Sequence, residues 1–135
     1  MAQVSKRTMK PEIKKQIYEL FWDSLAKLKN AQEAEKFYLD LLTYTEKVVL
    51  AKRWAIAVLL LRGLGYSEIK ELLKVSDPTI TRVRNQLRAG GGFLLVAERL
   101  SRQEFWRQFA KGFEKPNSVY PRQRKSYLKF PFGAP

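Results

Sequence analysis

Apolar side chains recur every three or four residues along most of the first 100 positions, and this spacing constrains the fold more than any other feature of the sequence. It is the repeat of an amphipathic α-helix, in which such positions form one stripe. The first stripe follows Pro11, a residue suited to the first helical turn, and comprises Ile13, Ile17, Leu20, Phe21, Leu25 and Leu28. The same reasoning predicts an all-α chain with helices over residues 11–29, 32–42, 44–62, 67–73, 78–88 and 94–113.

The predicted helix 44–62 is apolar around most of its circumference in its second half. Thr43 and Glu46 have the spacing of a capping box, in which each side chain satisfies a free backbone donor at the start of a helix. Gly63 and Gly65 follow, and we expect them to end the helix because glycine tolerates a positive φ. A helix this apolar needs burial on several sides, and in a short chain a partner subunit is one way to provide it.

The helices predicted over residues 67–73 and 78–88 are short and are joined by a turn of only a few residues. We expect Ser67 to cap the first helix and Ser76 or Asp77 to cap the second, with Pro78 in the first turn of the second helix. Two short helices joined in this way form a helix-turn-helix unit. The apolar residues spaced to meet at the helix crossing are Ile69, Leu73, Val75, Ile80 and Val83.

The other side of helix 78–88 has the chemistry of a DNA-reading surface. Arginine can donate two hydrogen bonds to guanine, while asparagine and glutamine can pair with adenine. We expect base edges or nearby phosphates to be contacted by Thr79, Thr81, Arg82, Asn85 and Gln86. We expect phosphates to be held by Lys70, Lys74 and Arg88, and Ser67 and Ser76 complete the predicted DNA-binding set. The plain alternative is an amphipathic helical hairpin whose polar residues are merely solvated.

Lys74 stands in the turn where many helix-turn-helix units have glycine. A left-handed conformation would cost a lysine there about 1–2 kcal/mol. Such a cost is tolerable at a DNA-facing position, because the ammonium group can meet a phosphate.

The charge balance points to a polyanionic partner. Lys and Arg number 26 against 13 Asp and Glu, which gives a net charge of +13 and a pI near 10.1. We expect a basic arm over residues 1–10, a folded domain over 11–100 and a basic, aromatic and partly disordered extension over 101–135. That extension carries eight basic and two acidic residues. Its alternative is an inert tail.

Several function classes lack the residues that they need. Cysteine and histidine are absent, which removes disulfides, thiolate chemistry, the commonest general base and the commonest metal ligand. We therefore expect no enzymatic activity, no metal and no cofactor. No apolar run of about 18 residues suggests a membrane span, and the first residues lack the apolar core of a secretory signal. The expected location is the cytoplasm.

Five short motifs, taken in order, resemble those of the Trp repressor family. They are Leu41-Leu42-Thr43, Leu50-Ala51-Lys52-Arg53, Leu60-Leu61-Arg62-Gly63, Tyr66-Ser67-Glu68-Ile69 and Thr79-Ile80-Thr81-Arg82. The likeness covers about residues 12–100 and is nearest to the YerC/YecD-like branch, which continues into a stretch like Gly90-Gly91-Gly92-Phe93. It implies an intertwined helical homodimer that binds double-stranded DNA and regulates transcription, most simply as a repressor.

The resemblance also locates a possible effector site. It aligns Arg53 and Arg82 with the two arginines that hold the indole of L-tryptophan in the Trp repressor. However, Val83 replaces a glycine beside the ring, and Gln86 replaces a serine near the ligand's amino group. We therefore expect constitutive DNA binding or a different, unknown effector, and not L-tryptophan.

Two other readings remain open. Residues 45–50 followed by 66–69 also resemble a sigma-factor or response-regulator output domain, which would act as a monomer, although the helices over 11–42 argue against it. Alternatively, the basic ends would coat DNA or RNA without sequence choice. Basic and aromatic residues alternate over 120–130, and such aromatic side chains can stack on exposed bases.

Overall fold

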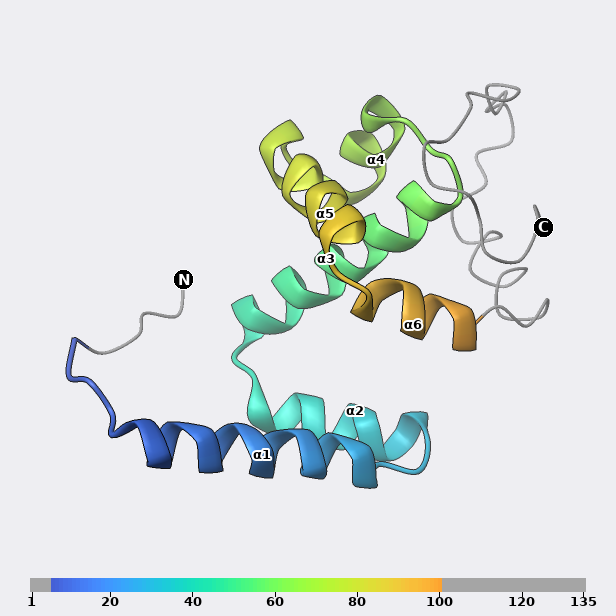
Figure 1. Cartoon of the computed structure of the whole chain (residues 1–135). Coiled ribbons are helices and arrows are strands. Elements are labelled where there is room, and N and C mark those ends of the chain that lie inside the picture. Colours follow the sequence, from blue (N-terminus) through green and yellow to red (C-terminus); the bar gives the residue numbers. More distant parts are fainter. Residues whose placement is uncertain (1–5, 101–135) are drawn as a thin grey trace. The chain divides into compact units, whose positions relative to one another are not determined.

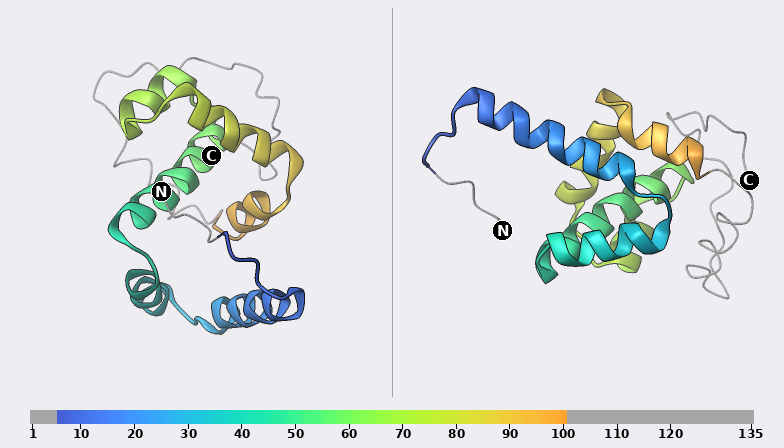
Figure 2. Two further views of the ribbon diagram at one scale, coloured as in Figure 1. Left: turned by 90° about the vertical axis from the view of Figure 1, so that its left-hand side faces the viewer. Right: turned by 90° about the horizontal axis from the view of Figure 1, so that it is seen from below.

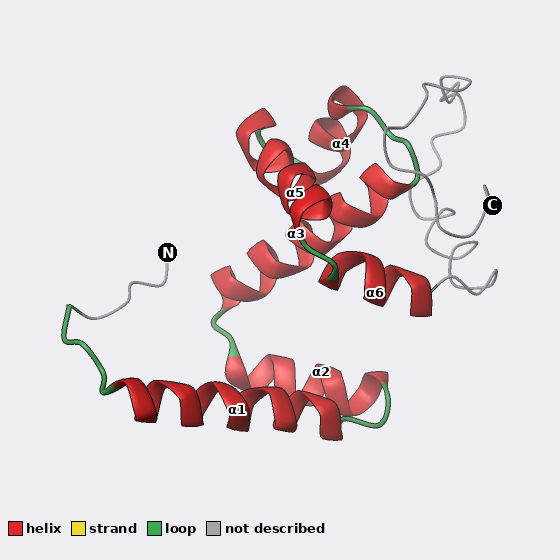
Figure 3. Ribbon diagram, in the orientation of Figure 1, coloured by secondary structure: helices red, strands yellow, loops and turns green. Residues whose placement is uncertain are grey.

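The computed structural model describes residues 6–100, and all regular structure within that range is helical (Figures 1 and 3). The chain divides into two compact units, residues 1–50 and 51–135, which are described separately. The all-α prediction is confirmed. The predicted extension 101–135 lies outside the described residues, as does the first half of the predicted basic arm. None of the described helices is both long enough and apolar enough to cross a membrane.

The first unit contains α1 (Pro11–Lys27), α2 (Ala31–Leu41) and the start of α3 (Tyr44–Leu61). Asn30 caps α2 by accepting a hydrogen bond from the backbone N–H of Glu33 at 2.9 Å. The hydroxyl of Tyr38 donates to the carbonyl oxygen of Lys47 at 2.5 Å, which ties α2 to the first turns of α3. Neither α1 nor α2 contains a buried residue. The apolar stripes predicted from the sequence therefore exist, but one chain does not bury them.

The capping box predicted at the start of α3 is present. The N–H of Thr43 donates to the Glu46 carboxylate at 2.7 Å, and the N–H of Glu46 donates to the Thr43 hydroxyl at 3.3 Å. These hydrogen bonds from Thr43 lower the pKa of Glu46, because they favour its ionised form. A local pair of residues, Thr43 and Glu46, is therefore sufficient to fix where α3 begins.

The second unit contains the rest of α3, α4 (Tyr66–Leu73), α5 (Asp77–Ala89) and α6 (Gly92–Arg99). Its buried core is Ile56, Ala57, Leu59, Leu61, Ile69, Ile80, Val83, Leu87 and Ala97. The rings of Trp54 and Phe93, 5.7 Å apart, pack α6 against α3. The burial that the apolar end of α3 needs is thus supplied by this chain, so the case for a partner subunit rests on α1 and α2.

Most helix boundaries differ from the sequence expectation by one or two residues, and two of the differences involve glycines. Gly63 ends α3 with a φ of 85°, as predicted, but Gly65 has a φ of −81° and instead caps the start of α4. The helix predicted over 94–113 begins earlier, at Gly92, and only Gly90 and Gly91 separate it from the end of α5 at Ala89. The predicted part of that helix beyond Leu100 lies outside the described residues.

Candidate nucleic-acid interface

Helices α4 and α5 lie side by side and form a helix-turn-helix unit (Figure 2). Lys74 ends α4 in the left-handed conformation, with φ 53° and ψ 56°, and its N–H donates to the carbonyl oxygen of Lys70 at 2.9 Å. Ser76 then caps α5: its hydroxyl accepts from the N–H of Thr79 at 3.4 Å and lies 2.9 Å from the Thr79 hydroxyl. Of the two caps that the sequence left open, Ser76 and Asp77, the serine is the one present, and Lys74 adopts the left-handed conformation whose cost was considered above.

The residue that caps α4 differs from the one predicted from the sequence. Ser67 was expected to cap this helix, but it lies inside the first turn, and Gly65 occupies the cap position. The free N–H of Gly65 donates to the carboxylate of Glu68 at 2.8 Å. A glycine has no side chain with which to accept a hydrogen bond, so only this half of a capping box is formed. The spacing Gly65-x-x-Glu68 was the signal that the sequence reading missed.

Apolar residues fix the crossing of the two helices as predicted. Ile69 of α4 and Ile80 of α5 are fully buried, and Val83 is 4% exposed. Leu73 and Val75 are partly buried against the same core. Because residues 80, 83 and 87 fall on one side of α5, the opposite side of that helix is turned toward solvent.

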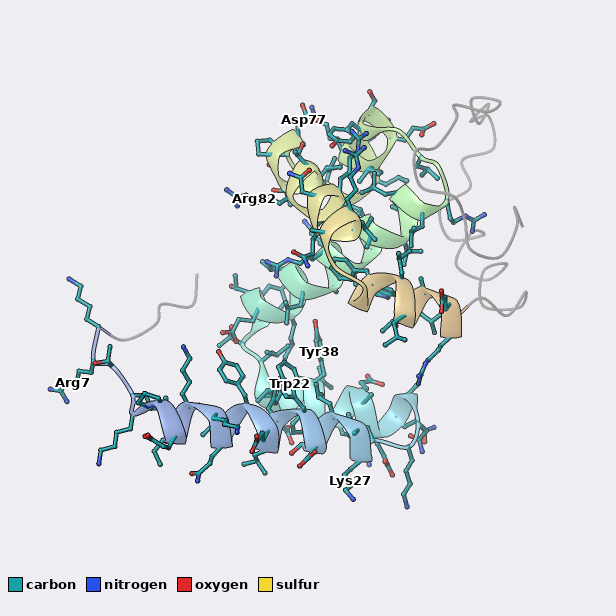
Figure 4. All side chains as sticks on the ribbon, in the orientation of Figure 1. Arg7, Trp22, Lys27, Tyr38, Asp77 and Arg82 are labelled. Atoms are coloured by element: carbon teal, nitrogen blue, oxygen red, sulfur yellow. The ribbon has the colours of Figure 1, made fainter. Side chains whose placement is uncertain are left out.

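The predicted DNA-binding residues lie on the solvent side of this unit. On α5 the exposed members are Thr81, Arg82, Asn85, Gln86 and Arg88, while Thr79 is half-buried. Figure 4 shows Arg82 extending outward from the helix. On α4 and the turn, the exposed members are Ser67, Lys70, Lys74 and Ser76. The structure therefore gathers these side chains on α4, on α5 and at the turn between them.

Lys70 has a partner within the protein. Its ammonium nitrogen lies 3.1 Å from the carboxylate of Asp77, so an ion pair joins α4 to the first turn of α5. A phosphate contact by Lys70 would therefore compete with this pair or share the lysine with it.

Gln86 lies close to the glycine that ends α5. A Cβ on Gly90 would stand only 2.7 Å from the Gln86 side-chain nitrogen. The absence of a side chain at Gly90 thus gives the glutamine room to fold toward the end of its own helix. Its place on the flank of the exposed surface makes it a less direct candidate for base contact than Arg82 or Asn85.

Tyr66 and Arg84 belong to this surface but are not among the residues predicted from the sequence. The Tyr66 hydroxyl lies 3.1 Å from the Thr81 hydroxyl and is also hydrogen-bonded to Arg84. Partial burial raises the pKa of Tyr66, but these hydrogen bonds and the charges of Arg84 and Arg88 outweigh that effect and leave the pKa below its usual value. No spacing rule reveals a contact between residues 66 and 81, because it depends on the angle at which the helices cross.

The two arginines aligned with an effector site are both exposed, Arg53 on α3 and Arg82 on α5. Val83, which takes the place of a ring-side glycine, belongs to the buried core. Within residues 6–100, no group of three carboxylates is placed to hold a metal ion.

The sequence model for the Trp repressor protein family matches residues 16–100. The match takes in the whole of α4 and α5 and most of α1. No curated protein matches the chain, and no solved structure does. The family is one of helix-turn-helix regulators that bind DNA. Because the match spans more than half of the chain, this protein belongs to the Trp repressor protein family.

Proposed function

We propose that the protein is a sequence-specific regulator of transcription that binds double-stranded DNA through α4 and α5 and acts as a repressor. One observation carries the proposal: α5 buries an apolar stripe against its own unit and turns arginine and amide side chains to solvent. Its segment 79–88 holds three arginines and no acidic residue. A helix of this kind fits the major groove, where base edges present distinct donor and acceptor patterns.

Roles for the individual residues follow from where they lie. Arg82 and Asn85 are placed to meet base edges, with Thr79, Thr81 and Gln86 at their sides. Lys74, in the turn before α5, and Arg88, in the last turn of α5, are placed to meet phosphates. Ser67 and Ser76 lie at the starts of the two helices, where hydroxyl groups commonly contact the backbone of DNA. The strained backbone of Lys74 agrees with a functional position, since strain is often stored at binding sites.

We further propose that two chains form an intertwined homodimer through α1 and α2. Leu20 is 67% exposed and Trp22 is 56% exposed in the single chain, and the other exposed apolar residues of these helices include Ile13, Ile17, Tyr18, Leu25, Leu39 and Leu41. A face this large is unusual for a monomer in water and is typical of a surface that a partner covers. A two-fold dimer would present two copies of α5 to successive turns of DNA.

The same family comparison leads to a proposal about the effector. We infer that L-tryptophan is not the corepressor, because Val83 belongs to the core where the family resemblance expects an open space beside a glycine. A place in the YerC/YecD-like branch, suggested by residues 90–93, agrees with this. DNA binding is then constitutive or is governed by a different ligand, and a cytoplasmic location suits a protein that acts on DNA.

Selection of bound fragments from random duplex DNA tests the proposed function. The enriched fragments should share a palindromic sequence whose half-sites lie one helical turn apart, about 34–36 Å. An Arg82→Ala/Asn85→Ala double variant, selected in parallel, should recover no such sequence. A single asymmetric half-site would favour a monomeric module of the sigma-factor type. Recovery of unenriched DNA would favour the coating role that the net charge of +13 allows.

A further inference from the structure

The hydroxyl groups of Tyr66 and Thr81 lie 3.1 Å apart and join the first residue of α4 to the exposed side of α5. Arg84 holds the same phenol oxygen from one turn further along α5. An arginine can only donate, so the oxygen of Tyr66 accepts from Arg84 and still shares a hydrogen bond with Thr81. Tyr66 itself is half-buried. The phenol is therefore held in place by two residues of the helix that would enter the groove.

This contact restricts the side chain of Thr81. A helical threonine otherwise divides between two rotamers, because its hydroxyl can also bond to a backbone carbonyl one turn earlier. The hydroxyl and the methyl group occupy separate staggered positions on Cβ, so engaging one of them fixes the other. Because the Thr81 hydroxyl is hydrogen-bonded to Tyr66, the methyl group is the part of the Thr81 side chain that remains available to contact a base.

We propose that Tyr66 is a positioning residue that makes Thr81 read a thymine through its methyl group. The inference rests on the proposed function and deepens it by assigning one base to one side chain. Thymine is the one base whose major-groove edge carries a methyl group, and a threonine methyl is among the apolar groups that contact it. Arg84, which donates to Tyr66, would then be held on the side of α5 that faces α4.

Uracil provides the decisive probe, because it pairs and presents hydrogen-bonding groups as thymine does but lacks the methyl. Each thymine of the selected duplex is replaced by uracil in turn, and the affinity of the full chain is measured. One position in each half-site should weaken binding about fourfold, the loss expected for one buried methyl group. The remaining replacements act as controls.

Three variants then assign the effect to its residues. Thr81→Val retains a methyl group without the hydroxyl and should keep the fourfold discrimination, whereas Thr81→Ser retains the hydroxyl alone and should lose it. Tyr66→Phe removes only the phenol oxygen and should reduce the discrimination to less than about twofold. Tyr44→Phe removes an exposed phenol at the start of α3 and should leave the discrimination unchanged.

The outcomes separate the two proposals. Failure to select any preferred duplex overturns the proposed function, and this inference with it. A preferred duplex that lacks thymine, or that binds equally well with uracil at every position, overturns the inference alone. Full discrimination in Tyr66→Phe also overturns it, as does a result in which Thr81→Ser discriminates and Thr81→Val does not. These serine and valine variants remain informative even if Tyr66→Phe fails to fold.

Discussion

The ammonium nitrogen of Lys70 lies 3.1 Å from the carboxylate of Asp77, and both side chains are about half exposed. The pair bridges the turn of the helix-turn-helix unit. Its lysine is one of the residues that the sequence predicts to hold DNA phosphates. Exposed ion pairs contribute at most about 1 kcal/mol to folding. The carboxylate therefore matters more for what Lys70 can bind than for the stability of the unit.

Asp77→Asn should raise the affinity for duplex DNA, because it releases Lys70 and removes a negative charge beside the phosphates. The same substitution in a Lys70→Ala background should have a smaller effect, since only the charge of Asp77 itself is then lost. Fluorescence anisotropy at several salt concentrations measures both. An equal gain in the two backgrounds would show that Lys70 never contacts a phosphate.

Lys74→Gly should stabilise the free protein by about 0.5–1 kcal/mol. Relief of the left-handed backbone is worth about 1–2 kcal/mol, and the greater freedom of glycine in the unfolded chain offsets about 0.5–1 kcal/mol of it. Lys74→Ala is the matched control, because it retains the strain and should give no gain in thermal or urea unfolding. Equal unfolding midpoints for the two variants would show that the left-handed backbone at position 74 does not destabilise the protein.

Both Lys74 variants should lower DNA affinity alike for all sequences. The slope of log affinity against log salt concentration should fall by about one unit, the effect of losing one phosphate contact.

Leu20→Glu should convert the proposed dimer to a monomer. Leu20 is 67% exposed in one chain, so a charge there has no reason to harm an isolated subunit. Leu95→Glu makes the same substitution at a leucine of α6 that is 52% exposed and lies outside α1 and α2, so it should leave the assembly intact. Sedimentation at micromolar concentration should give twice the 15.8 kDa of one chain for the wild type and Leu95→Glu. A wild-type mass of one chain would contradict the homodimer.

L-tryptophan should neither bind the protein nor change its affinity for DNA. A ring placed beside Arg82 would have to displace Val83 from the core, and overpacking of this kind costs about 1–3 kcal/mol. Titration calorimetry with the full chain, alone and with the selected duplex, provides the measurement. Micromolar binding that tightens the DNA complex would require the core around Val83 to open and would refute the proposal.

The features that could be read from the sequence are those set by neighbours within a turn. The Thr43 and Glu46 capping box, the Ser76 cap and the positive φ of Gly63 all follow from the types of two or three adjacent residues. The burial of Ile80 and Val83 follows from helical periodicity. Ser67 was misread because serine is a common cap, whereas the Glu68 carboxylate accepts from the N–H of Gly65 and the helix starts with Gly65 as its cap, two residues earlier.

The features that could not be read depend on how two helices cross. Residues 66 and 81 meet across the turn, as do Lys70 and Asp77, and helical periodicity cannot predict either contact because the turn separates the two residues into different helices. Arg84 was overlooked for the same reason: on a helical wheel it flanks the apolar stripe, and only the position of Tyr66 gives it a role. The periodicity of α1 reveals an apolar face but does not reveal that one chain leaves it exposed.

The most direct test of base reading by α5 compares wild type with Arg82→Lys on the selected duplex and on a scrambled duplex of the same length and composition. Lysine keeps the charge of arginine but loses its two-pronged donor geometry. If Arg82 reads a base edge, Arg82→Lys should weaken the selected complex by about 1–3 kcal/mol while leaving the scrambled complex and its salt dependence unchanged. Equal affinity of the two proteins for the selected duplex, or a wild type that does not distinguish the two duplexes, would contradict sequence-specific reading of DNA by α5.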